Sequence, residues 1–419
     1  MTGFEILQEV EERVILVGVS TGEGDDTEQS LDELEELAKT AGAVTVGRVI
    51  QNREQIHPGT YIGTGKIAEV QQLAYEVEAT GIICDDELSP AQLKNLEEEL
   101  DLKVMDRTLI ILDIFASRAS TSEGKIQVEL AQLKYRQARL VGLGSSLSRL
   151  GGGIGTREPG EKKLEMDRRL IKSRIAQLNR ELEEVKRHRE VARSRRSRQS
   201  TAVIAIVGYT NAGKSTLLNT LTGAQVLEED KLFATLDPTT RILELPSGQE
   251  ILLTDTVGFI RKLPHHLIDA FRSTLEEAKY ADIILHVVDA SSPQMDQQMY
   301  VVYETLKNLG VTDKKIVTLF NKQDKMTENQ PHRDLKAEKT IRISAKWGEG
   351  LGEVKQILED LLNEKNVLIE RFYDYRDAGV ISLIRKYGQL LEEEYRGDGI
   401  YVKAYVPMEI YGAVTPDRK

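Results

Sequence analysis

The sequence contains a single cysteine, Cys84, and no run close to the roughly 20 consecutive apolar residues that a membrane span needs. One cysteine cannot form a disulfide within the chain, and it cannot build a zinc ribbon. The first residues, MTGFEILQEVEER, are acidic and lack the basic segment and apolar stretch of a secretion signal. These absences predict a cytoplasmic protein without a membrane span.

The bulk composition is that of a globular protein. Hydrophobic residues make up 40% and charged residues 30%, and the 10 prolines do not indicate disorder. A length of 419 residues exceeds what one hydrophobic core usually organises, so we expect two to four domains. The 56 Lys and Arg against 68 Asp and Glu give a formal charge of −12, which by itself argues against nucleic-acid binding.

The charge is unevenly distributed along the chain. Residues 133–198 contain 19 Lys and Arg against 8 Asp and Glu, a local charge of +11, which leaves −23 for the remainder. The densest part, KRHREVARSRRSR at 186–198, has seven basic residues and one acidic residue. A solvated helix face usually explains a charge run, but a run of one sign in an otherwise acidic protein favours binding to a phosphate backbone.

The first 120 residues alternate between short β-rich runs and helix-like stretches, which predicts an N-terminal α/β domain over residues 1–120 with a largely parallel sheet. The β-rich runs are 14–19, 44–50 and 81–84, and the helix-like stretches are 31–39, 66–77 and 90–100. Within this domain, GTGK at 63–66 opens a helix and could arrange amide groups around an anion. Its spacing is shorter than that of a glycine-rich phosphate loop, so we favour a helix-entry turn.

Residues 121–200 are predicted to form an antiparallel helical hairpin with a glycine-rich, basic loop at its tip. The segment 142–160 holds seven glycines together with Arg149 and Arg157, so the helix pattern is expected to break there. The second helix, 161–198, would be about 55 Å long. The apolar residues that recur at helical spacing are Ile126, Leu130, Leu133 and Leu140 before this segment, and Leu164, Ile171, Ile175, Leu178, Leu182 and Val185 after it.

A phosphate-binding loop follows the hairpin. The run TAVIAIV at 201–207 is typical of a buried strand, and it continues into GYTNAGKS and a helix-like TLLNTLTG. This is the GxxxxGKS/T motif in its required order of strand, loop and helix. Lys214 would reach the β- and γ-phosphates, and Ser215 would supply an oxygen to Mg²⁺. The predicted nucleotide-binding residues of the loop are Gly208, Tyr209, Thr210, Asn211, Ala212, Gly213, Lys214 and Ser215.

Three further motifs follow in order. The strand 250–254 leads to DTVG, in which Asp255 can hold Mg²⁺ through water and Gly258 can offer an amide to the γ-phosphate. The strand 315–320 ends in NKQD, where the Asp324 carboxylate can accept both the ring N–H and the amino group of guanine. SAK, after a further short strand, can close over the base. The residues predicted to bind nucleotide here are Asp255, Thr256, Val257, Gly258, Asn321, Lys322, Gln323, Asp324, Ser344, Ala345 and Lys346.

The four motifs together resemble the guanine-nucleotide signature of small GTPases. They predict a G domain over residues 201–364 that binds GTP and GDP with Mg²⁺ and hydrolyses GTP. We assign catalysis to Lys214 and to the amide of Gly258.

The segment FATLDPTTR at 233–241 resembles the first switch of the Obg and HflX branch of phosphate-loop GTPases. By that resemblance Thr235 joins Ser215 as a Mg²⁺ ligand, and Thr239 is the rival candidate. The switch residues predicted to contact nucleotide are Phe233, Ala234, Thr235, Leu236 and Asp237.

Two positions bear on how fast GTP would be hydrolysed. Phe259 follows DTVG where Ras-like enzymes carry a water-orienting glutamine, and an apolar ring cannot polarise water. We therefore expect slow hydrolysis that is activated by a partner. Asn211 resembles the asparagine of potassium-activated GTPases, so K⁺ stimulation and an ordinary hydrogen bond within the loop are the two interpretations of this residue.

Over nearly its whole length the chain resembles the bacterial HflX family. The likeness rests on the N-terminal α/β domain, the loop SRLGGGIGTREPGE on a helical hairpin, and a G domain with FATLDPTTR and DTVGF. It implies a ribosome-associated GTPase that docks on the large ribosomal subunit, splits or rescues stalled ribosomes and probes ribosomal RNA near the peptidyl-transferase centre with its hairpin loop. The +11 hairpin, found independently, is what such a role requires. We expect the protein to act as a monomer.

The last part of the chain, residues 365–419, is predicted to be a small α/β domain without an assigned function. It contains a helix candidate at 378–395 and a β-rich run at 400–406. The predicted fold class is therefore α/β multidomain, with an N-terminal α/β domain, a helical hairpin, a phosphate-loop GTPase domain and this C-terminal domain.

Three alternatives stay open at this stage. The GTPase could act on another RNA, in ribosome assembly or tRNA modification. The N-terminal domain could be an ATP-dependent RNA-remodelling enzyme that uses Lys66, with the G domain as its regulator. The chain could also be an RNA-binding module that keeps nucleotide only for structure.

Overall fold

A computed structural model of the chain describes residues 11–22, 26–150, 159–197, 201–224, 232–264, 267, 277–326, 332–364 and 366–415. The chain forms two compact units, the first from Met1–Leu182 with Lys262–Phe271 and the second from Glu183–Arg261 with Arg272–Lys419. In the part of the chain that is described, no helix is both long and apolar enough to cross a membrane.

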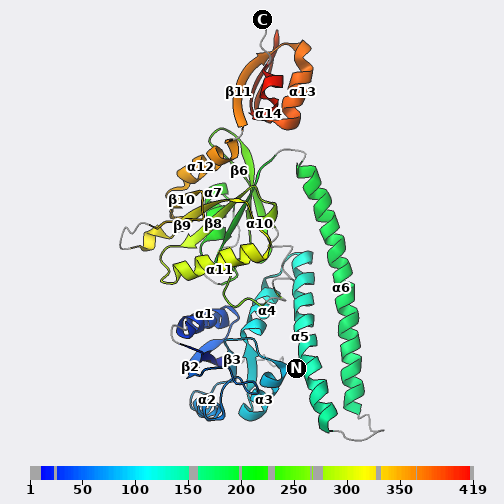
Figure 1. Ribbon diagram of the computed structural model, residues 1–419, viewed down its shortest axis with the longest axis vertical. Helices are drawn as coiled ribbons and strands as arrows, with labels where there is room; N and C mark the ends of the chain where they lie inside the picture. The colour runs from blue at the N-terminus through cyan, green and yellow to red at the C-terminus, as the bar shows by residue number, and fades with distance from the viewer. Residues whose placement is uncertain are drawn as a thin grey trace, which may run out of the picture. The chain divides into compact units, whose positions relative to one another are not determined.

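The first unit contains a four-stranded parallel sheet in the order β2-β1-β3-β4. Helices α1 and α4 contact each other and cover one face, and α2 and α3 contact each other and cover the opposite face (Figure 1). The central strands are buried on both faces, which explains their continuous apolar sequence. The elements are β1 Arg13–Ser20, α1 Thr27–Thr40, β2 Val44–Asn52, α2 Thr64–Glu76, β3 Gly81–Cys84, α3 Pro90–Leu100, β4 Lys103–Asp106 and α4 Arg107–Arg118.

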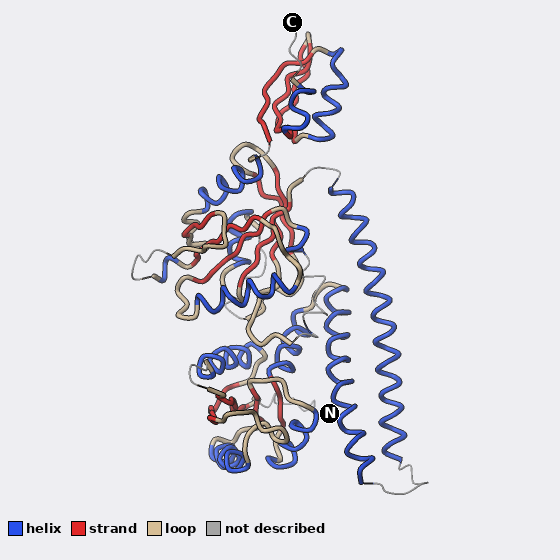
Figure 2. The backbone as a smooth tube through the Cα atoms, viewed as in Figure 1, coloured by secondary structure: helices blue, strands red, loops and turns tan. Residues whose placement is uncertain are grey.

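Two long helices follow, α5 Ser122–Leu150 and α6 Pro159–Ser197. They run antiparallel (Figure 2), because Leu130 packs on Leu178 and the Arg174 guanidinium donates to the Glu129 carboxylate at 2.7 Å. The predicted hairpin is therefore present. Its tip, residues 151–158, lies outside the described residues.

α5 ends and α6 begins within the segment 142–160, where the break was predicted. The break comes later than the first glycines of that segment, because α5 continues through Gly142 and Gly144 to Leu150. Each glycine costs a helix only about 1 kcal/mol relative to alanine. That cost is too small to stop a helix whose first turns are held by buried residues such as Leu130 and Tyr135.

The buried Asp106, at the junction of β4 and α4, ties α5 to the sheet. Its carboxylate accepts hydrogen bonds from the Leu109 backbone N–H at 2.9 Å, from the Tyr135 hydroxyl at 2.7 Å and from Arg139 at 2.6 Å. The first of these caps α4, and the other two come from α5. One side chain thus positions α5 relative to the four-stranded sheet.

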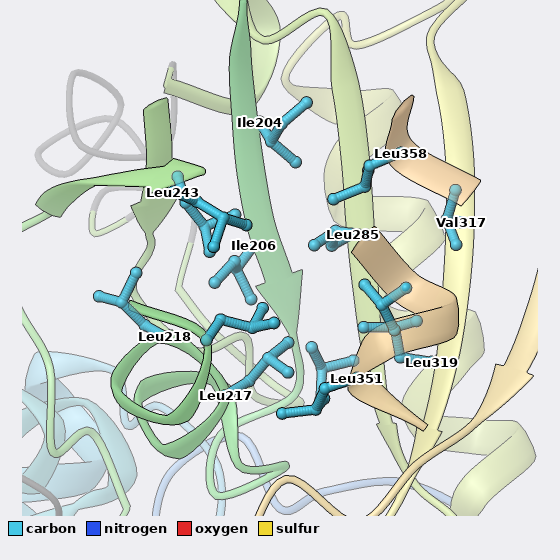
Figure 3. Close-up of a cluster of buried hydrophobic side chains, with 14 of the residues drawn as sticks. Ile204, Ile206, Leu217, Leu218, Leu243, Leu285, Val317, Leu319, Leu351 and Leu358 are labelled. Carbon is cyan, nitrogen blue, oxygen red and sulfur yellow. The ribbon is translucent and has the colours of Figure 1, made fainter. Parts of the chain in front are cut away.

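The second unit contains a six-stranded sheet in the order β10-β9-β8-β5-β7-β6, in which only the edge strand β6 is antiparallel to its neighbour. Leucines of α7 and α12 pack against one face of the sheet (Figure 3). The strands are β5 Val203–Gly208, β6 Thr239–Glu244, β7 Glu250–Asp255, β8 Ile283–Asp289, β9 Lys315–Asn321 and β10 Lys339–Arg342. The helices are α7 Lys214–Thr222, α10 Glu277–Tyr280, α11 Met295–Asn308 and α12 Leu351–Asn363, with a short 3₁₀ turn η1 at Gln323–Lys325.

The end of the chain forms a three-stranded antiparallel sheet in the order β11-β13-β12, packed on two helices. Its elements are β11 Asn366–Tyr373, the 3₁₀ turn η2 Tyr375–Asp377, α13 Ala378–Tyr387, β12 Gln389–Arg396, β13 Gly399–Pro407 and α14 Met408–Val414. The α/β multidomain class is confirmed. The limits of the four predicted parts stay a prediction.

One secondary-structure prediction in this region was wrong. The helix expected over 378–395 ends at Tyr387, and the remaining residues form β12. Gly388 adopts an extended backbone against β13, where an added Cβ would lie 2.8 Å from the carbonyl oxygen of Tyr405. Pairing of β12 with β13 thus outweighs the helix propensity of the Leu- and Glu-rich residues that form β12.

Candidate nucleotide site

A cavity of about 370 Å³ lies in the second unit, where the carboxyl ends of parallel strands open toward the start of α7. Ligands of open α/β sheets bind at this edge. The cavity gathers four predicted motifs that are far apart in the sequence. It is lined by Thr210, Asn211, Gly213, Lys214, Ser215, Thr216, Phe233, Ala234, Thr235, Gly258, Asn321, Lys322, Asp324, Lys325, Ala345 and Lys346.

The loop before α7 has the geometry of a phosphate cradle. Gly213 has φ of +96°, and an added Cβ would lie 2.3 Å from the Asn321 amide nitrogen, so only glycine fits. Lys214 is buried, and its ammonium donates to the Tyr209 carbonyl at 2.8 Å. Burial lowers the pKa of Lys214 to about 8, against the opposing effect of the Asp255 carboxylate. The Lys214 amino group is thus shielded from water and borders the cavity, an arrangement that suits the binding of a phosphate group.

Three oxygen-bearing side chains meet beside this lysine. The Ser215 hydroxyl donates to the Asp255 carboxylate at 2.8 Å and lies 2.8 Å from the Thr235 hydroxyl. The other carboxylate oxygen of Asp255, Oδ1, is buried without a hydrogen-bond partner among the described residues. Burial raises the pKa of this carboxyl group, although Lys214 opposes the rise. Oxygen donors around an unsatisfied carboxylate oxygen fit Mg²⁺, which prefers oxygen ligands.

The two rival threonines occupy different places. Thr235 lines the cavity beside Ser215, whereas Thr239 lies in β6, paired with Asp255 across the strand ladder. Ahead of Thr235, Phe233 is buried with φ of +55°, and its backbone N–H donates to the Thr210 hydroxyl at 2.8 Å. The start of the switch segment is therefore held on the phosphate loop.

The opposite end of the cavity is formed by NKQD and SAK. The Asn321 amide donates to the Ala212 carbonyl and accepts from the Ala345 backbone N–H, each at 2.9 Å, so it joins the phosphate loop to the SAK loop. Ser344 is buried and donates to one carboxylate oxygen of the exposed Asp324 at 2.6 Å. This bond orients the carboxylate that lines the cavity where a base would enter.

Several predicted residues stand behind the cavity wall rather than in it. Gln323 donates to the Phe320 carbonyl at 3.1 Å, and Thr256 donates to the Ile206 carbonyl at 2.7 Å. The predicted residues that do not line the cavity are Gly208, Tyr209, Ala212, Leu236, Asp237, Asp255, Thr256, Val257, Gln323 and Ser344. Thr216 and Lys325 line it but were not predicted, although each directly follows a motif and adjacency alone could have indicated them.

Phe259 does not reach toward the cavity as a water-orienting side chain would. Its ring is buried, its backbone N–H donates to the Gly208 carbonyl at 3.1 Å, and its carbonyl accepts from the Thr210 N–H at 2.7 Å. The residue therefore fastens DTVGF to the phosphate loop through its backbone and offers no group that could polarise water.

The GTGK segment of the first unit lies at the start of α2. Gly63 is the residue before the helix, and its N–H donates to the Gln51 side chain at 2.8 Å. The Lys66 ammonium forms an ion pair with Glu69 one turn further along, at 2.7 Å. These contacts are those of a helix-entry turn.

Comparison with known proteins gives three family matches along the chain. Residues 28–116 match the family described as GTP-binding GTPase N-terminal, residues 118–196 its middle region, and residues 203–322 the family described as 50S ribosome-binding GTPase. The GTPase HflX of Lacrimispora saccharolytica is 69% identical over 99% of this chain and 98% of its own length. The chain belongs to the HflX family.

Other members of the HflX family are also similar over most of the chain. The GTPase HflX of Caldanaerobacter subterraneus subsp. tengcongensis is 50% identical over 97% of this chain and 94% of its own length. That of Escherichia coli is 41% identical over 84% of this chain and 83% of its own length. Among solved structures, a GTP-binding protein from Sulfolobus solfataricus in complex with GDP is 26% identical, covering 84% of this chain and 99% of its own, with a TM-score of 0.44.

Membership of the HflX family confirms the predicted activity. The protein binds guanine nucleotides and hydrolyses GTP to GDP and phosphate.

Proposed function

We propose that this HflX-family GTPase is a ribosome-associated factor that binds the large ribosomal subunit and splits or rescues stalled ribosomes, acting as a cytoplasmic monomer. The observation that carries the proposal is the basic arm, defined as residues 133–198, with its charge of +11 in a chain of net charge −12. Helices α5 and α6 make up most of this arm. An arm with this excess of positive charge suits the phosphate backbone of RNA, and the family matched by residues 203–322 is described as ribosome-binding.

The chemistry at the cavity is assigned to residues that line it or support it. Lys214 neutralises charge on the β- and γ-phosphates, and the backbone N–H of Gly258 holds the γ-phosphate in place. Ser215 and Thr235 would hold Mg²⁺, with Asp255 behind them, and the ion would neutralise phosphate charge when bound. Asn211 lines the same cavity with φ of +58°, and K⁺ stays a prediction for it.

Slow hydrolysis by the protein alone, raised by the large subunit, is the central expectation. No group at Phe259 polarises water, so activation must come from a partner that orders the site. We expect purified large subunits to raise the GTP turnover number by about 1,000-fold or more, the lower end of the range over which a partner activates other GTPases. The measurement is phosphate release from GTP with a titration of large subunits, with purified small subunits as the control.

Unchanged turnover over a wide range of large-subunit concentration would contradict the ribosomal role. The alternative substrates, assembling ribosomal particles or tRNA, are separated by crosslinking from the arm. RNA recovered from a photoreactive group near residue 150 identifies the partner directly.

The basic arm is expected to contribute through binding to phosphates. Arg193, Arg195 and Arg196 lie in the last turns of α6. Replacing all three by alanine should weaken binding to large subunits, and the slope of log affinity against log salt should fall by about 1 for each phosphate that the arm no longer neutralises. Sedimentation binding between low and moderate salt measures both quantities.

The matched control removes the same charge elsewhere. Lys39, Lys94 and Lys103 lie on the first unit, each in an exposed ion pair. Their triple alanine variant should keep the salt slope of the unmodified protein. An unchanged slope in the arginine variant would make this part of the arm a solvated helix face.

A further inference from the structure

Lys322, the second residue of NKQD, lines the nucleotide cavity with an uncommon backbone conformation. Its φ of +63° lies in the left-handed region, which is unfavourable for a residue with a side chain. Such a conformation persists only when the surroundings hold it. On one side of the residue, the Asn321 carbonyl accepts from the Ala290 N–H at 3.0 Å. On the other side, the Lys322 carbonyl accepts from the Lys325 N–H at 2.9 Å, so the backbone is held at both ends.

The side chain of Lys322 is held by the carboxylate of Asp289, the last residue of β8. The Lys322 ammonium lies 2.7 Å from Asp289 Oδ2, and each of the two side chains is only 17% exposed. Asp289 lies opposite Asn321 in the pairing of β8 with β9, so the sheet fixes the position of the carboxylate relative to the motif. A charged hydrogen bond that is mostly shielded from water is a stronger contact than an ion pair between two solvated side chains.

The other carboxylate oxygen of Asp289 orients the side chain. Oδ1 accepts from the Ser291 backbone N–H at 3.0 Å and from the Ser291 hydroxyl at 2.6 Å. These two bonds leave Oδ2 for Lys322. Asp289 itself does not line the cavity, whereas Lys322 does. The carboxylate therefore reaches the nucleotide site through Lys322.

A second carboxylate, that of Asp324, follows two residues after Lys322. It is exposed, lines the cavity and, among the described residues, accepts a hydrogen bond from the Ser344 hydroxyl alone. Its remaining capacity to accept is what guanine needs. Because both side chains line the cavity, a Lys322 ammonium released from Asp289 would compete with the base for the Asp324 carboxylate. The pair with Asp289 prevents this competition.

We propose that Asp289 is a positioning residue for guanine-nucleotide binding, which fixes Lys322 at the base end of the cavity and leaves the Asp324 carboxylate free to accept from the base. The proposal rests on the assignment of this cavity as the nucleotide site. It concerns affinity and not catalysis, because Lys214 and Ser215, which are assigned to the phosphates and to Mg²⁺, lie in α7.

The contact should act mainly on the lifetime of bound GDP. Changes within one binding interface alter dissociation rates far more than association rates. GDP can enter the cavity whether or not Lys322 is paired, so the association rate should depend little on Asp289. Once GDP is bound, a released Lys322 ammonium competes for Asp324, and the complex should dissociate faster.

The test is Asp289→Asn in the full chain, assayed without ribosomes. Asparagine keeps an oxygen for the Ser291 bonds but has an amide N–H₂ in place of the oxygen that holds Lys322. We expect the GDP dissociation rate to rise about tenfold, with the association rate constant within about twofold of that of the unmodified protein. Stopped-flow fluorescence with a labelled GDP analogue measures both rates. Calorimetric titration should show the GDP and GTP dissociation constants rising together.

Single-turnover hydrolysis, with the protein in saturating excess over GTP, separates positioning from damage to the domain. The rate in Asp289→Asn should stay within about twofold of the unmodified protein, because bound GTP meets the same phosphate loop. A domain that is loosened as a whole would lose rate and affinity together. Glu304→Gln, which removes a carboxylate paired with Lys307 on α11, is the matched control and should change neither quantity.

A double-mutant cycle tests whether Asp289 acts through Lys322. Lys322→Met removes the ammonium and keeps an apolar side chain. Asp289→Asn combined with Lys322→Met should then bind GDP no more weakly than Lys322→Met alone. Asp289→Glu keeps the charge and should retain most of the affinity. If Asp289→Asn does not fold, Asp289→Gln is compared with Asp289→Glu, since the two side chains match in length and differ in charge, and the glutamine variant should bind GDP about tenfold more weakly.

Three results would overturn the proposal: an unchanged GDP affinity in Asp289→Asn, a fall in the saturated hydrolysis rate as large as the fall in affinity, or additive losses in the double variant. An incorrect assignment of the cavity would show differently, as near-normal GDP affinity in Lys214→Ala. None of these measurements depends on ribosomes, so a failure of ribosomal stimulation would contradict the proposed function while leaving the effect of Asp289→Asn intact.

Discussion

Lys214→Ala is expected to abolish measurable GTP hydrolysis and to weaken GTP and GDP binding by at least about 100-fold. The ammonium is buried in the cavity, and truncating one partner of a desolvated charge pair costs about 2–5 kcal/mol. A loss of about 3 kcal/mol corresponds to the 100-fold change. Calorimetric titration with GDP and single-turnover hydrolysis of GTP measure the two effects.

The same substitution should leave the fold intact. Without nucleotide, Lys214 is a cation held away from water, and burial lowers its pKa to about 8. Alanine removes the desolvation cost of the buried ammonium group, so the thermal midpoint of the nucleotide-free protein should not fall. Lys307→Ala, at an exposed position on α11, controls for the loss of a lysine in the same unit and should keep wild-type affinity. Near-normal GDP affinity in Lys214→Ala would contradict the assigned phosphate contact.

Asp324→Asn is expected to relax the preference for guanine. A carboxylate accepts from the ring N–H and the amino group of guanine, and a site built to pair a polar group discriminates strongly against analogues that leave it unpaired. Asparagine places a donor where an acceptor is needed. GTP affinity should therefore fall by about 100-fold or more, and affinity for xanthosine triphosphate, which has a carbonyl in place of the amino group, should rise.

The geometry around Asp324 makes this test specific. Ser344 donates to one carboxylate oxygen at 2.6 Å, a bond that asparagine can keep through its own carbonyl, so the side chain should stay in position. Competition binding with GTP, ATP and xanthosine triphosphate measures the change in preference. Asp296→Asn, in the first turn of α11, removes the same charge away from the cavity and should leave the preference unaltered. An equal loss of affinity for all three nucleotides would mean that Asp324 stabilises the loop and does not contact the base.

Much of the candidate site could be predicted because its motifs are local. The spacing from Gly208 to Ser215 requires a strand, a turn and a helix in succession, and the structure has β5, the cradle and α7 in that order. The apolar strands of the six-stranded sheet were likewise recognisable, because a buried parallel strand is apolar on both faces. The binding and metal roles of individual residues stay predictions.

The structure departs from local preference where distant contacts compete with it. Residues 389–396 have helix-forming composition but pair with β13, and α5 runs through two glycines because its earlier turns are packed. Local propensity amounts to tenths of a kcal/mol per residue, and tertiary contacts outweigh it.

By itself the sequence determined the guanine-nucleotide motifs, the family resemblance and the charge of the arm, because each depends on residue identity and spacing along the chain. Tertiary structure alone placed Thr235 beside Ser215, and it alone joined the phosphate loop to the SAK loop through Asn321. No local pattern marks these contacts. They exist only because the fold brings together residues that are far apart in the sequence, and a buried polar group left without a partner would cost free energy.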